Sequence, residues 1–595
     1  MLPTHARLTQ GYVLITSLMA LIVLILLVTV YLTTSLTSPK TAKANADSLS
    51  GFMAAEGGLN MRSAVIREKF IGYERPSGSS PTDPKTACTT GATQGGGDFA
   101  CKTYTLGGKQ VVSYINENTK NPNGDSGTVS AGELYAGLSY LQYGYQVNSV
   151  ARGGTGASEK QADVSMQFQS RLVPLFQFAA FYTSDLEISP GAPMTLNGRV
   201  HTNSSLYMSP GTSLSITGKV SAGQSIYRTR KDNGTCGAGN VQFSVGSALG
   251  CTGSAELSKA QLDAYNGYVL AHQPQLTVPS LATLDPDPTG SLKNELWSKA
   301  DVRVVATPCG PTFCLSVVKS DGSPDVIASA ALNACSVPGP AAAVGFSSNM
   351  YDAREGKNIQ MMDVDSTKML TCIQASGVFK DSEGNPLSMA DTTGGGLALH
   401  FSFSPPSAAY GVRIKNAKTV GTSTGVTPKG LTIATNEPMY VQGDYNSPTD
   451  PTKRVSASLL ADSINVLSNS WSDVNKIAGT KVTGNPSLKA TNTTINAAFL
   501  AGIVPTTGAD YSGGLENYPR LHEDWGGVTL TYSGSFANLG ASRYGTAKWP
   551  GTGTFFYEAA TRNWSFDTNF ENADKLPPLA PRFIYLRQQY FARNY

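Results

Sequence analysis

The chain has few charged residues and few histidines, and both shortages limit the function classes open to it. Only 15% of its 595 residues are charged, the net charge is +3 and no basic patch stands out, so composition does not support nucleic-acid binding. No P-loop is present, so the chain is not a P-loop motor ATPase. The five histidines show no metal-binding spacing, since His522-Glu523-Asp524 is not an H-E-x-x-H motif. We therefore expect no cofactor, no metal and no nucleic-acid partner.

Catalytic signals are also scarce. Residues 421–425 match G-x-S-x-G, but they lie in a Gly/Ser/Thr-rich loop without the strand-to-helix context of a nucleophile. The carboxylate pairs available for glycosidic chemistry are Asp363 with Asp365, which would share one face of a strand, and Glu523 with Asp524, which would not. Both pairs are interpreted as solvated turn residues. The turns at 321–325 and 381–385 lack the spacing of a full EF-hand calcium loop. We expect no catalytic residues and no enzyme.

What the chain does contain is an uncharged apolar run from Tyr12 to Leu32, preceded only by a short polar leader, residues 1–11. Roughly 20 helical residues span about 30 Å, the thickness of a bilayer core. The run therefore predicts a membrane-spanning helix. Basic residues lie on both sides of it, Arg7 before and Lys40 and Lys43 after, so they give little guidance on orientation.

Three interpretations of this run compete. A secretory signal would have a shorter apolar region and a small-x-small cleavage site directly after it, and residues 31–35 make a poor site. A plain signal anchor fits the length. In the third interpretation, a prepilin-type signal, cleavage falls before the apolar run and after a glycine, and Gly11 stands at that place.

A second block strengthens the third interpretation. It follows the apolar run and consists of Ala54, Ala55, Glu56, Gly57, Gly58, Leu59 and Asn60. Together with the Gly-Tyr-Val-Leu-Ile start at residues 11–15, it resembles the N-terminal domain of PilX-type minor pilins, whose apolar helix runs on into a segment reading A-A-E-x-G-L. The resemblance ends at about residue 70. It implies that a prepilin peptidase cuts after Gly11 and methylates Tyr12, and that the helix packs with other pilin-like subunits.

The chain departs from major pilins at one position. Major pilins carry a glutamate at the fifth mature position, which helps to register subunits in the filament, whereas this chain has Thr16 there. A carboxylate in lipid is costly unless it meets a partner such as a free amine. The resemblance with this departure implies a rare initiator, tip or accessory subunit of a type IV pilus or a secretion pseudopilus.

The helix is predicted to continue beyond the membrane. Apolar residues from Leu49 to Phe70 recur at helical spacings. Pro39 should kink or break the helix near residues 37–38, and the Gly57-Gly58 pair should serve close packing. The apolar stripe fits either the cover of the next domain's core or contacts within a filament.

The eight cysteines are even in number, and none sits in a C-x-x-C pair. They fall as neighbours: Cys88 and Cys101, Cys236 and Cys251, Cys309 and Cys314, Cys335 and Cys372. This layout suits short disulfide-closed loops in an oxidising compartment, although connectivity does not follow from sequence and eight unrelated buried thiols are the alternative. We expect a single-pass inner-membrane protein with a cytoplasmic N-terminus and its bulk in the periplasm, at the cell surface or in a pilus.

The body is predicted to be mainly β, because Gly, Pro, Thr, Ser and Val abound and no long amphipathic helix separates the short apolar segments. Residues 196–200 recur as residues 216–220, and a period near twenty is what one rung of a parallel β-solenoid requires. The body is therefore expected to be a β-helix or solenoid, or else a sandwich. The expected organisation is a leader (1–11), a pilin-like helix (12–72), an irregular α/β region (73–165), a solenoid-like body with Cys-bearing insertions (166–510) and an aromatic-rich cap (511–595). The last stretch resembles the C-terminal region of large PilX-like envelope proteins.

The leading hypothesis is thus a structural minor pilin or pseudopilin, with a tip, initiator or adhesion role. The alternatives are a signal-anchored β-helix enzyme acting on polysaccharide and a plain anchored envelope protein. Cleavage after Gly11 distinguishes the first from the other two.

Overall fold

A computed structural model describes residues 9–71, 76–81, 88, 94–118, 124–153, 159–251, 253, 256–292, 294–335, 342–381 and 384–594. The structure is mostly β with a long N-terminal apolar helix, which confirms the predicted fold class. Most of the leader lies outside the described residues.

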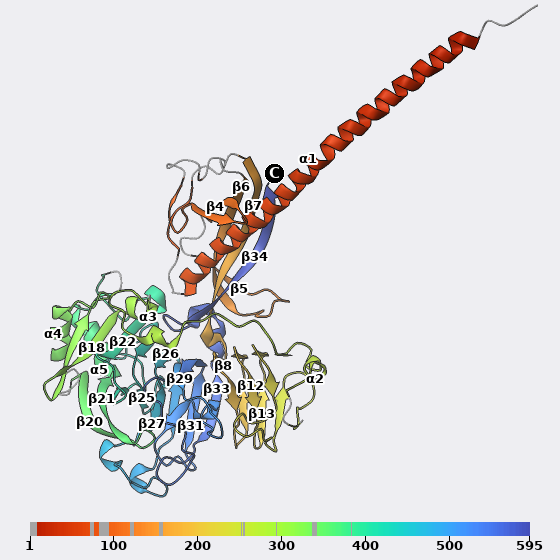
Figure 1. The fold of residues 1–595 in the computed structure, drawn as a ribbon. Coiled ribbons are helices and arrows are strands. Elements are labelled where there is room, and N and C mark those ends of the chain that lie inside the picture. The colour runs from red at the N-terminus through yellow and green to blue at the C-terminus, as the bar shows by residue number, and fades with distance from the viewer. Residues whose placement is uncertain are drawn as a thin grey trace, which may run out of the picture.

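The first element is α1 (Thr9–Ile71), a single helix of 63 residues that projects far from the rest of the molecule (Figure 1). The prediction of a break at Pro39 is wrong, because α1 passes through that position. A proline removes one backbone donor from the helix. That loss is confined to one turn, while the sheet described next holds the helix on its C-terminal side.

The C-terminal half of α1 lies on an antiparallel sheet, and together they form the helix–sheet module. The sheet has the order β3-β4-β6-β7-β34, with β5 paired to β6. Its strands are β3 (Lys102–Leu106), β4 (Lys109–Glu117), β5 (Asp125–Thr128), β6 (Ser139–Gly153), β7 (Glu159–Pro174) and β34 (Arg582–Asn594). A two-stranded sheet, β1 (Gly78–Ser79) with β2 (Gly96–Gly97), lies beside it in sequence. The region expected to be irregular is therefore largely an ordered sheet.

The remaining strands form a parallel solenoid. One sheet of eleven strands runs its whole length, and its strands in spatial order are β17 (Val269–Leu270), β14 (Val220–Ala222), β11 (Val200–Thr202), β8 (Ala180–Tyr182), β32 (Phe536–Ala541), β29 (Ala498–Ile503), β26 (Ser456–Ala461), β24 (Gly430–Thr435), β22 (Leu397–Phe403), β18 (Val302–Cys309) and β19 (Thr312–Val318). All its neighbours pair in parallel except β18 with β19, which form a hairpin.

Shorter sheets form the other faces. On the second face they are β15 (Ile226–Tyr227), β12 (Leu206–Met208) and β9 (Leu186–Ile188), then β20 (Val344–Asp352), β21 (Lys357–Asp365), β23 (Tyr410–Lys415), β25 (Met439–Gln442), β27 (Ile464–Leu467) and β30 (Pro519–Leu521). On the third they are β10 (Met194–Leu196), β13 (Ser213–Ile216) and β16 (Asn240–Phe243), then β28 (Thr493–Asn496), β31 (Thr529–Gly534) and β33 (Thr561–Phe566).

The predicted repeat of twenty residues is the step between two turns of this solenoid. Leu196 pairs with Ile216 in the β10–β13 ladder, and Val200 pairs with Val220 in the β11–β14 ladder. Each turn places its apolar side chains in one continuous core, where Leu196, Val200, Ile216 and Val220 are all buried. Equivalent apolar residues of successive turns therefore stack on one another, as a solenoid requires.

The chain enters and leaves the solenoid in its middle rather than at an end. It starts at β8 and winds outward to β17, crosses to the far end at β18, and then winds back to β32, which pairs with β8. The expected terminal cap at 511–595 differs from this arrangement. Several of its aromatic residues fill the interior where the two halves meet, with the Tyr532 ring 4.5 Å from that of Phe536, and β34 returns to the helix–sheet module.

The segment between β17 and β18, here called the strap, crosses the outer face of the eleven-stranded sheet. Its Leu276, Leu281, Leu284 and Leu296 share a buried cluster with Phe178, Phe583 and side chains of β8, β24, β26, β29 and β32. The strap carries a 3₁₀ turn (Leu281–Leu284) and α3 (Glu295–Ser298). It covers the sheet face that points away from the solenoid core and joins it to the helix–sheet module.

The two Cys-bearing stretches expected to be insertions are the two ends of the solenoid. One end carries β16 and α2 (Lys259–Asp263), and the other carries the β18–β19 hairpin, α4 (Val326–Ala334) and α5 (Ser366–Ser376). The ends of a stacked sheet leave edge strands open to further pairing. The sequence therefore places six of its eight cysteines where the solenoid has to be terminated.

Candidate functional site

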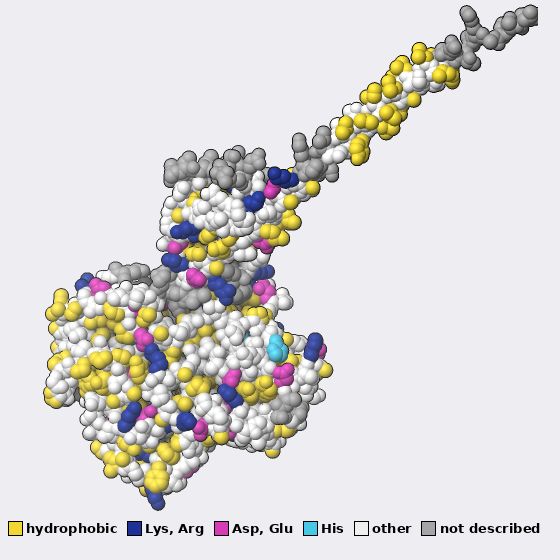
Figure 2. All heavy atoms as spheres, in the orientation of Figure 1, with side chains coloured by type: hydrophobic (Ala, Val, Ile, Leu, Met, Phe, Trp, Pro, Cys, Tyr) yellow, Lys and Arg dark blue, Asp and Glu magenta, His cyan; other side chains and the backbone are white. Residues whose placement is uncertain are grey.

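The N-terminal half of α1 is a bare apolar surface. The segment Tyr12–Ser35 contains an 18-residue window with a mean hydropathy of 3.0, none of which is buried, and Figure 2 shows hydrophobic side chains along it. The segment is long and apolar enough to cross a membrane. Its hydroxyl groups are satisfied within the helix, since Thr16 Oγ1 donates to the carbonyl of Tyr12 at 2.9 Å and Thr29 Oγ1 to that of Ile25 at 2.6 Å. The hydroxyls of Thr16, Ser17, Thr29, Thr33 and Thr34 therefore all have acceptors within the helix.

The predicted processing residues, Gly11 and Tyr12, lie in the first turn of α1, and the Tyr12 side chain is exposed. Thr16 lies one turn further on. Their roles in cleavage and in filament register remain predictions.

The motif of residues 54–59 lies where α1 meets the sheet. Ala54, Ala55 and Leu59 are buried in the cluster that joins the helix to β4, β6 and β7, whereas Glu56 and Gly57 are half-buried. A Cβ atom on Gly58 would lie 2.5 Å from Val111 Cγ1 and 2.9 Å from Ser149 Oγ. The small residues thus let the helix backbone approach the sheet closely. For this motif the structure supports the domain-cover interpretation, in which the helix covers the core of its own sheet.

A buried arginine, which sequence reasoning missed, fixes the end of the helix. The Arg62 guanidinium donates through Nη2 to the carbonyls of Asp98 and Ala100, both at 2.6 Å, and burial lowers its pKa. One turn later Arg67 Nη2 donates to Thr277 Oγ1 of the strap at 2.6 Å. A lone arginine in an apolar helical stripe gives no sequence signal of its partners, because both partners of Arg62 are backbone carbonyls.

The C-terminal strand also holds the helix. The ring of Phe591 on β34 packs edge-to-face on Phe52 at 6.1 Å, and the Arg593 guanidinium lies over the same Phe52 ring and donates to Ser48. The first and last elements of the described chain, α1 and β34, therefore pack together in the helix–sheet module.

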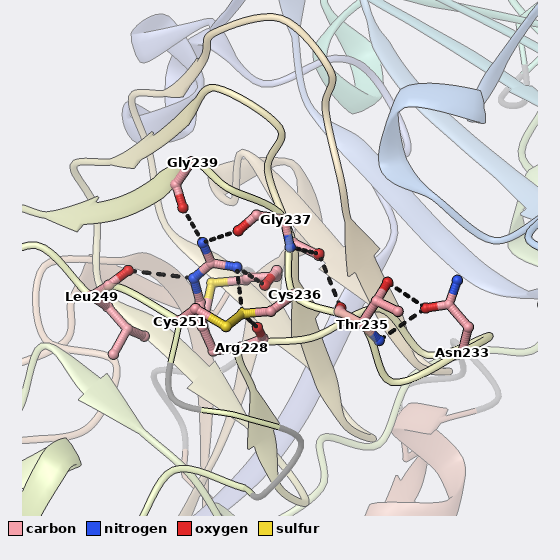
Figure 3. Close-up of a disulfide and its surroundings, with 10 residues drawn as sticks. Arg228, Asn233, Thr235, Cys236, Gly237, Gly239, Leu249 and Cys251 are labelled. Carbon is pink, nitrogen blue, oxygen red and sulfur yellow. Dashed lines mark hydrogen bonds between the residues drawn. A yellow bond between two sulfur atoms is a disulfide. The ribbon is translucent and has the colours of Figure 1, made fainter.

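The structure joins the eight cysteines as four disulfides, each between sequence neighbours: Cys88–Cys101, Cys236–Cys251, Cys309–Cys314 and Cys335–Cys372. The first closes the loop whose Asp98 and Ala100 accept from Arg62. The second lies beside Arg228, whose guanidinium is fully buried (Figure 3). Arg228 donates to the carbonyls of Met208 at 3.0 Å, Leu249 at 3.3 Å and Gly239. A buried charge thus organises the end turn that this disulfide closes.

The carboxylates considered for catalysis take part in structural contacts, and the prediction that they are solvated is wrong. Asp363 is buried and accepts from Arg413 Nε at 2.6 Å, and Arg413 also binds Asp473. Asp365 is buried at the start of α5 and accepts from the Lys368 backbone at 3.1 Å. Buried charges need such partners.

The second pair of carboxylates, Glu523 and Asp524, also takes part in structural contacts. Glu523 is buried and accepts from the backbone and hydroxyl of Ser468 at 2.6 and 2.7 Å, and burial raises its pKa to about 7. Asp524 accepts from Lys489 Nζ at 3.0 Å. Within the described ranges no group of three or more His, Cys, Asp or Glu residues could hold a metal ion.

Comparison with known proteins adds little to this geometry. No protein-family model matches the chain, and no curated protein matches it. Among solved structures, the crystal structure of competence-associated pilin ComZ from Thermus thermophilus is similar over 92% of this chain and 97% of that chain, with 11% identity and a TM-score of 0.24. Similarity at this level establishes neither a shared fold nor a shared function.

Proposed function

We propose that this protein is a minor pilin-like subunit, held in the inner membrane by α1, that takes part in assembling a type IV pilus or a related secretion filament. The observation that carries the proposal is the division of α1 into two halves. One half is apolar on every side and uncovered, and the other is seated on an antiparallel sheet by a small-residue motif. Such a helix presents its bare half to lipid or to other apolar helices, while its module stays outside the membrane.

Processing after Gly11 would make Tyr12 the first residue, and the bare apolar segment would then begin at the mature N-terminus. The four disulfides favour an oxidising compartment for the body. Together these features support a cytoplasmic leader and an extracytoplasmic body.

Two features favour a rare subunit over a bulk one. Thr16 bonds to its own helix and brings no carboxylate that would need an amine partner. The solenoid is also much larger than the helix–sheet module, and a body of this size beside every subunit would crowd a filament. A place at the tip, or as an initiator, would leave the solenoid room to project.

Mass spectrometry of the mature N-terminus from native membranes tests the proposal. A peptide that begins at N-methylated Tyr12 is the expected result, and a Gly11→Val variant should stay uncut while its body folds normally. An intact Met1 in the native protein would overturn the proposal and leave a plain anchored envelope protein. A start near residue 35 or later would mean ordinary secretion and reopen the enzyme alternative.

A further inference from the structure

Two loops on the side of the solenoid that faces away from α1 display apolar side chains to solvent. The loops are residues 473–490, the light-blue segment at the bottom of Figure 1, and residues 551–558. Val474 is 76% exposed, Ile477 is 63% exposed and Phe555 is 47% exposed. Such exposure means that the side chains project from the loops rather than line a groove. We call this set the distal tip, and Figure 2 shows hydrophobic side chains on that side of the body.

The distal tip is held in shape by bonds between its loops. Lys476 is buried and its Nζ donates to the Phe555 carbonyl at 2.8 Å, while the Val482 backbone donates to the Thr554 carbonyl at 2.5 Å. Thr483 Oγ1 donates to the Glu558 carboxylate at 2.6 Å. The apolar side chains therefore stand outward on a fixed support, because the loops already satisfy their polar groups internally.

The charged side chains of the two loops are mostly buried or paired: Lys476 is buried, and the half-buried Glu558 carboxylate accepts from Thr483. Of the charged side chains in the loop 473–490, Asp473 is bonded to Arg413 at 2.7 Å and Lys489 to Asp524 at 3.0 Å. Lys481 is exposed, and among the described residues no carboxylate lies within ion-pair distance of its ammonium group. The tip thus combines three projecting apolar side chains with one exposed lysine, Lys481, while its one carboxylate outside the described ion pairs, Glu558, is half-buried.

We propose that the distal tip inserts into the surface of a lipid bilayer that carries anionic headgroups. Projecting Val, Ile and Phe side chains suit a lipid surface, which accepts a convex apolar shape without a matching cavity, and a nearby lysine suits an anionic headgroup. A protein partner would instead require a complementary pocket for these anchors.

The bilayer at the tip is a different one from the bilayer that holds α1. The tip and the apolar half of α1 lie at opposite ends of the molecule (Figure 1). The chain would therefore bridge two lipid surfaces. This inference depends on the anchoring of α1 but not on prepilin processing or filament assembly.

Vesicle capture by the full-length protein tests the inference. The protein is placed in nanodiscs, so that α1 is already occupied, and binding of fluorescent vesicles of phosphatidylethanolamine and phosphatidylglycerol is measured. A Val474→Ser/Ile477→Ser variant should bind at least about tenfold more weakly, because each inserted aliphatic side chain contributes roughly a factor of ten. Val326→Ser is the matched control, since Val326 on α4 is 74% exposed but lies away from the tip, and it should bind like the wild type.

Two further measurements exclude a merely structural effect. Lys481→Glu should weaken capture of the anionic vesicles and leave capture of phosphatidylcholine vesicles unchanged. An Ile477→Trp variant should show a blue shift of its tryptophan emission when vesicles are added. Equal capture by the tip variant and the wild type would overturn the inference. Capture only of vesicles that carry membrane proteins would also overturn it, and would identify the partner as a protein.

Discussion

Pro174 and Arg582 are direct cross-strand partners at one end of the β7–β34 pair, although the entire solenoid lies between them in sequence. Beside this pair the Leu175 backbone donates to the Pro581 carbonyl at 2.8 Å, so the outgoing and returning chains also touch. The solenoid is therefore an insertion between two neighbouring strands of the helix–sheet module. Insertions are tolerated where the two ends of the inserted chain lie close together.

The first prediction follows from this pairing. Removal of residues 175–581, with Pro174 joined to Arg582 through an Asn-Gly turn, should leave a helix–sheet module that folds in detergent micelles, because a two-residue turn suits such a pair. Circular dichroism and protection of the β6 and β7 amides from hydrogen exchange are the measurements.

The control for this excision joins Pro174 to Phe583 instead. A slip of one residue turns every side chain of β34 to the opposite face, and would turn Ile584, which packs under α1, away from the helix. The shifted protein should lose amide protection. Equal protection in the two excised forms would show that β34 does not set the register.

The second prediction concerns the approach of α1 to the sheet. Gly58→Val should destabilise the module by about 1–3 kcal/mol, because the new side chain has no room between Val111 and Ser149 and overpacking costs roughly that much. Gly57→Ala is the control, since its Cβ atom would meet only the flexible end of Leu106 at 3.1 Å. Thermal unfolding followed by circular dichroism compares the two, and a Gly58→Val variant as stable as Gly57→Ala would contradict the close packing.

The local features of this fold could be predicted from sequence, and the long-range ones could not. The twenty-residue repeat at Leu196 and Ile216 predicted a solenoid because a stacked turn repeats its apolar positions locally. The pairing of β8 with β32, and of β7 with β34, joins segments that are far apart in the chain. Apolar periodicity says which side of a strand is buried but nothing about its partner, so the solenoid was expected to be followed by a cap rather than enclosed by one module.

In the candidate site, too, local features could be predicted from the sequence, whereas contacts between distant segments could not. The motif around Ala55 and Leu59 was recognised by its resemblance to a pilin segment, and the helical spacing of its apolar residues predicted a buried stripe; both residues are buried against the sheet. The predicted break at Pro39 is wrong, because the rule that proline ends a helix considers only neighbouring residues, and α1 continues on both sides of Pro39. Arg62 and Arg228 were missed because their partners are backbone carbonyls, which leave no trace in side-chain patterns.

The third prediction ranks the disulfides at one end of the solenoid. Loss of Cys335–Cys372, separated by 37 residues, should cost more stability than loss of Cys309–Cys314, separated by 5. The chain-entropy relation gives about 4 kcal/mol for the longer loop and about 2 kcal/mol for the shorter one. Paired Cys→Ala variants, compared by calorimetry without reductant, check the order. The reverse order would mean that the edge hairpin β18–β19, rather than loop closure, limits the stability of this end.

The fourth prediction concerns acid stability and rests on His400. Its imidazole is fully buried, with Nε2 at 3.0 Å from the Leu284 carbonyl of the strap, and burial lowers its pKa from 6.5 to about 4. The folded state therefore keeps this side chain neutral while the unfolded chain protonates it. Its contribution to stability is complete above pH 6.5 and is lost as the pH falls from 6.5 toward 4.

A His400→Asn variant should accordingly show a flatter loss of stability between pH 6.5 and 4 than the wild type, measured as the difference between the two curves. The difference between the curves is needed because Glu437 affects stability with the opposite sign in the same pH window. Burial raises the pKa of Glu437 to about 8, so folding favours its protonated form. The contribution of Glu437 to the stability of the folded state therefore falls as the pH rises. His272→Asn is the matched control, since that histidine is exposed. If both variants follow the wild-type curve, His400 does not link strap packing to pH, and the acid sensitivity of the chain has another origin.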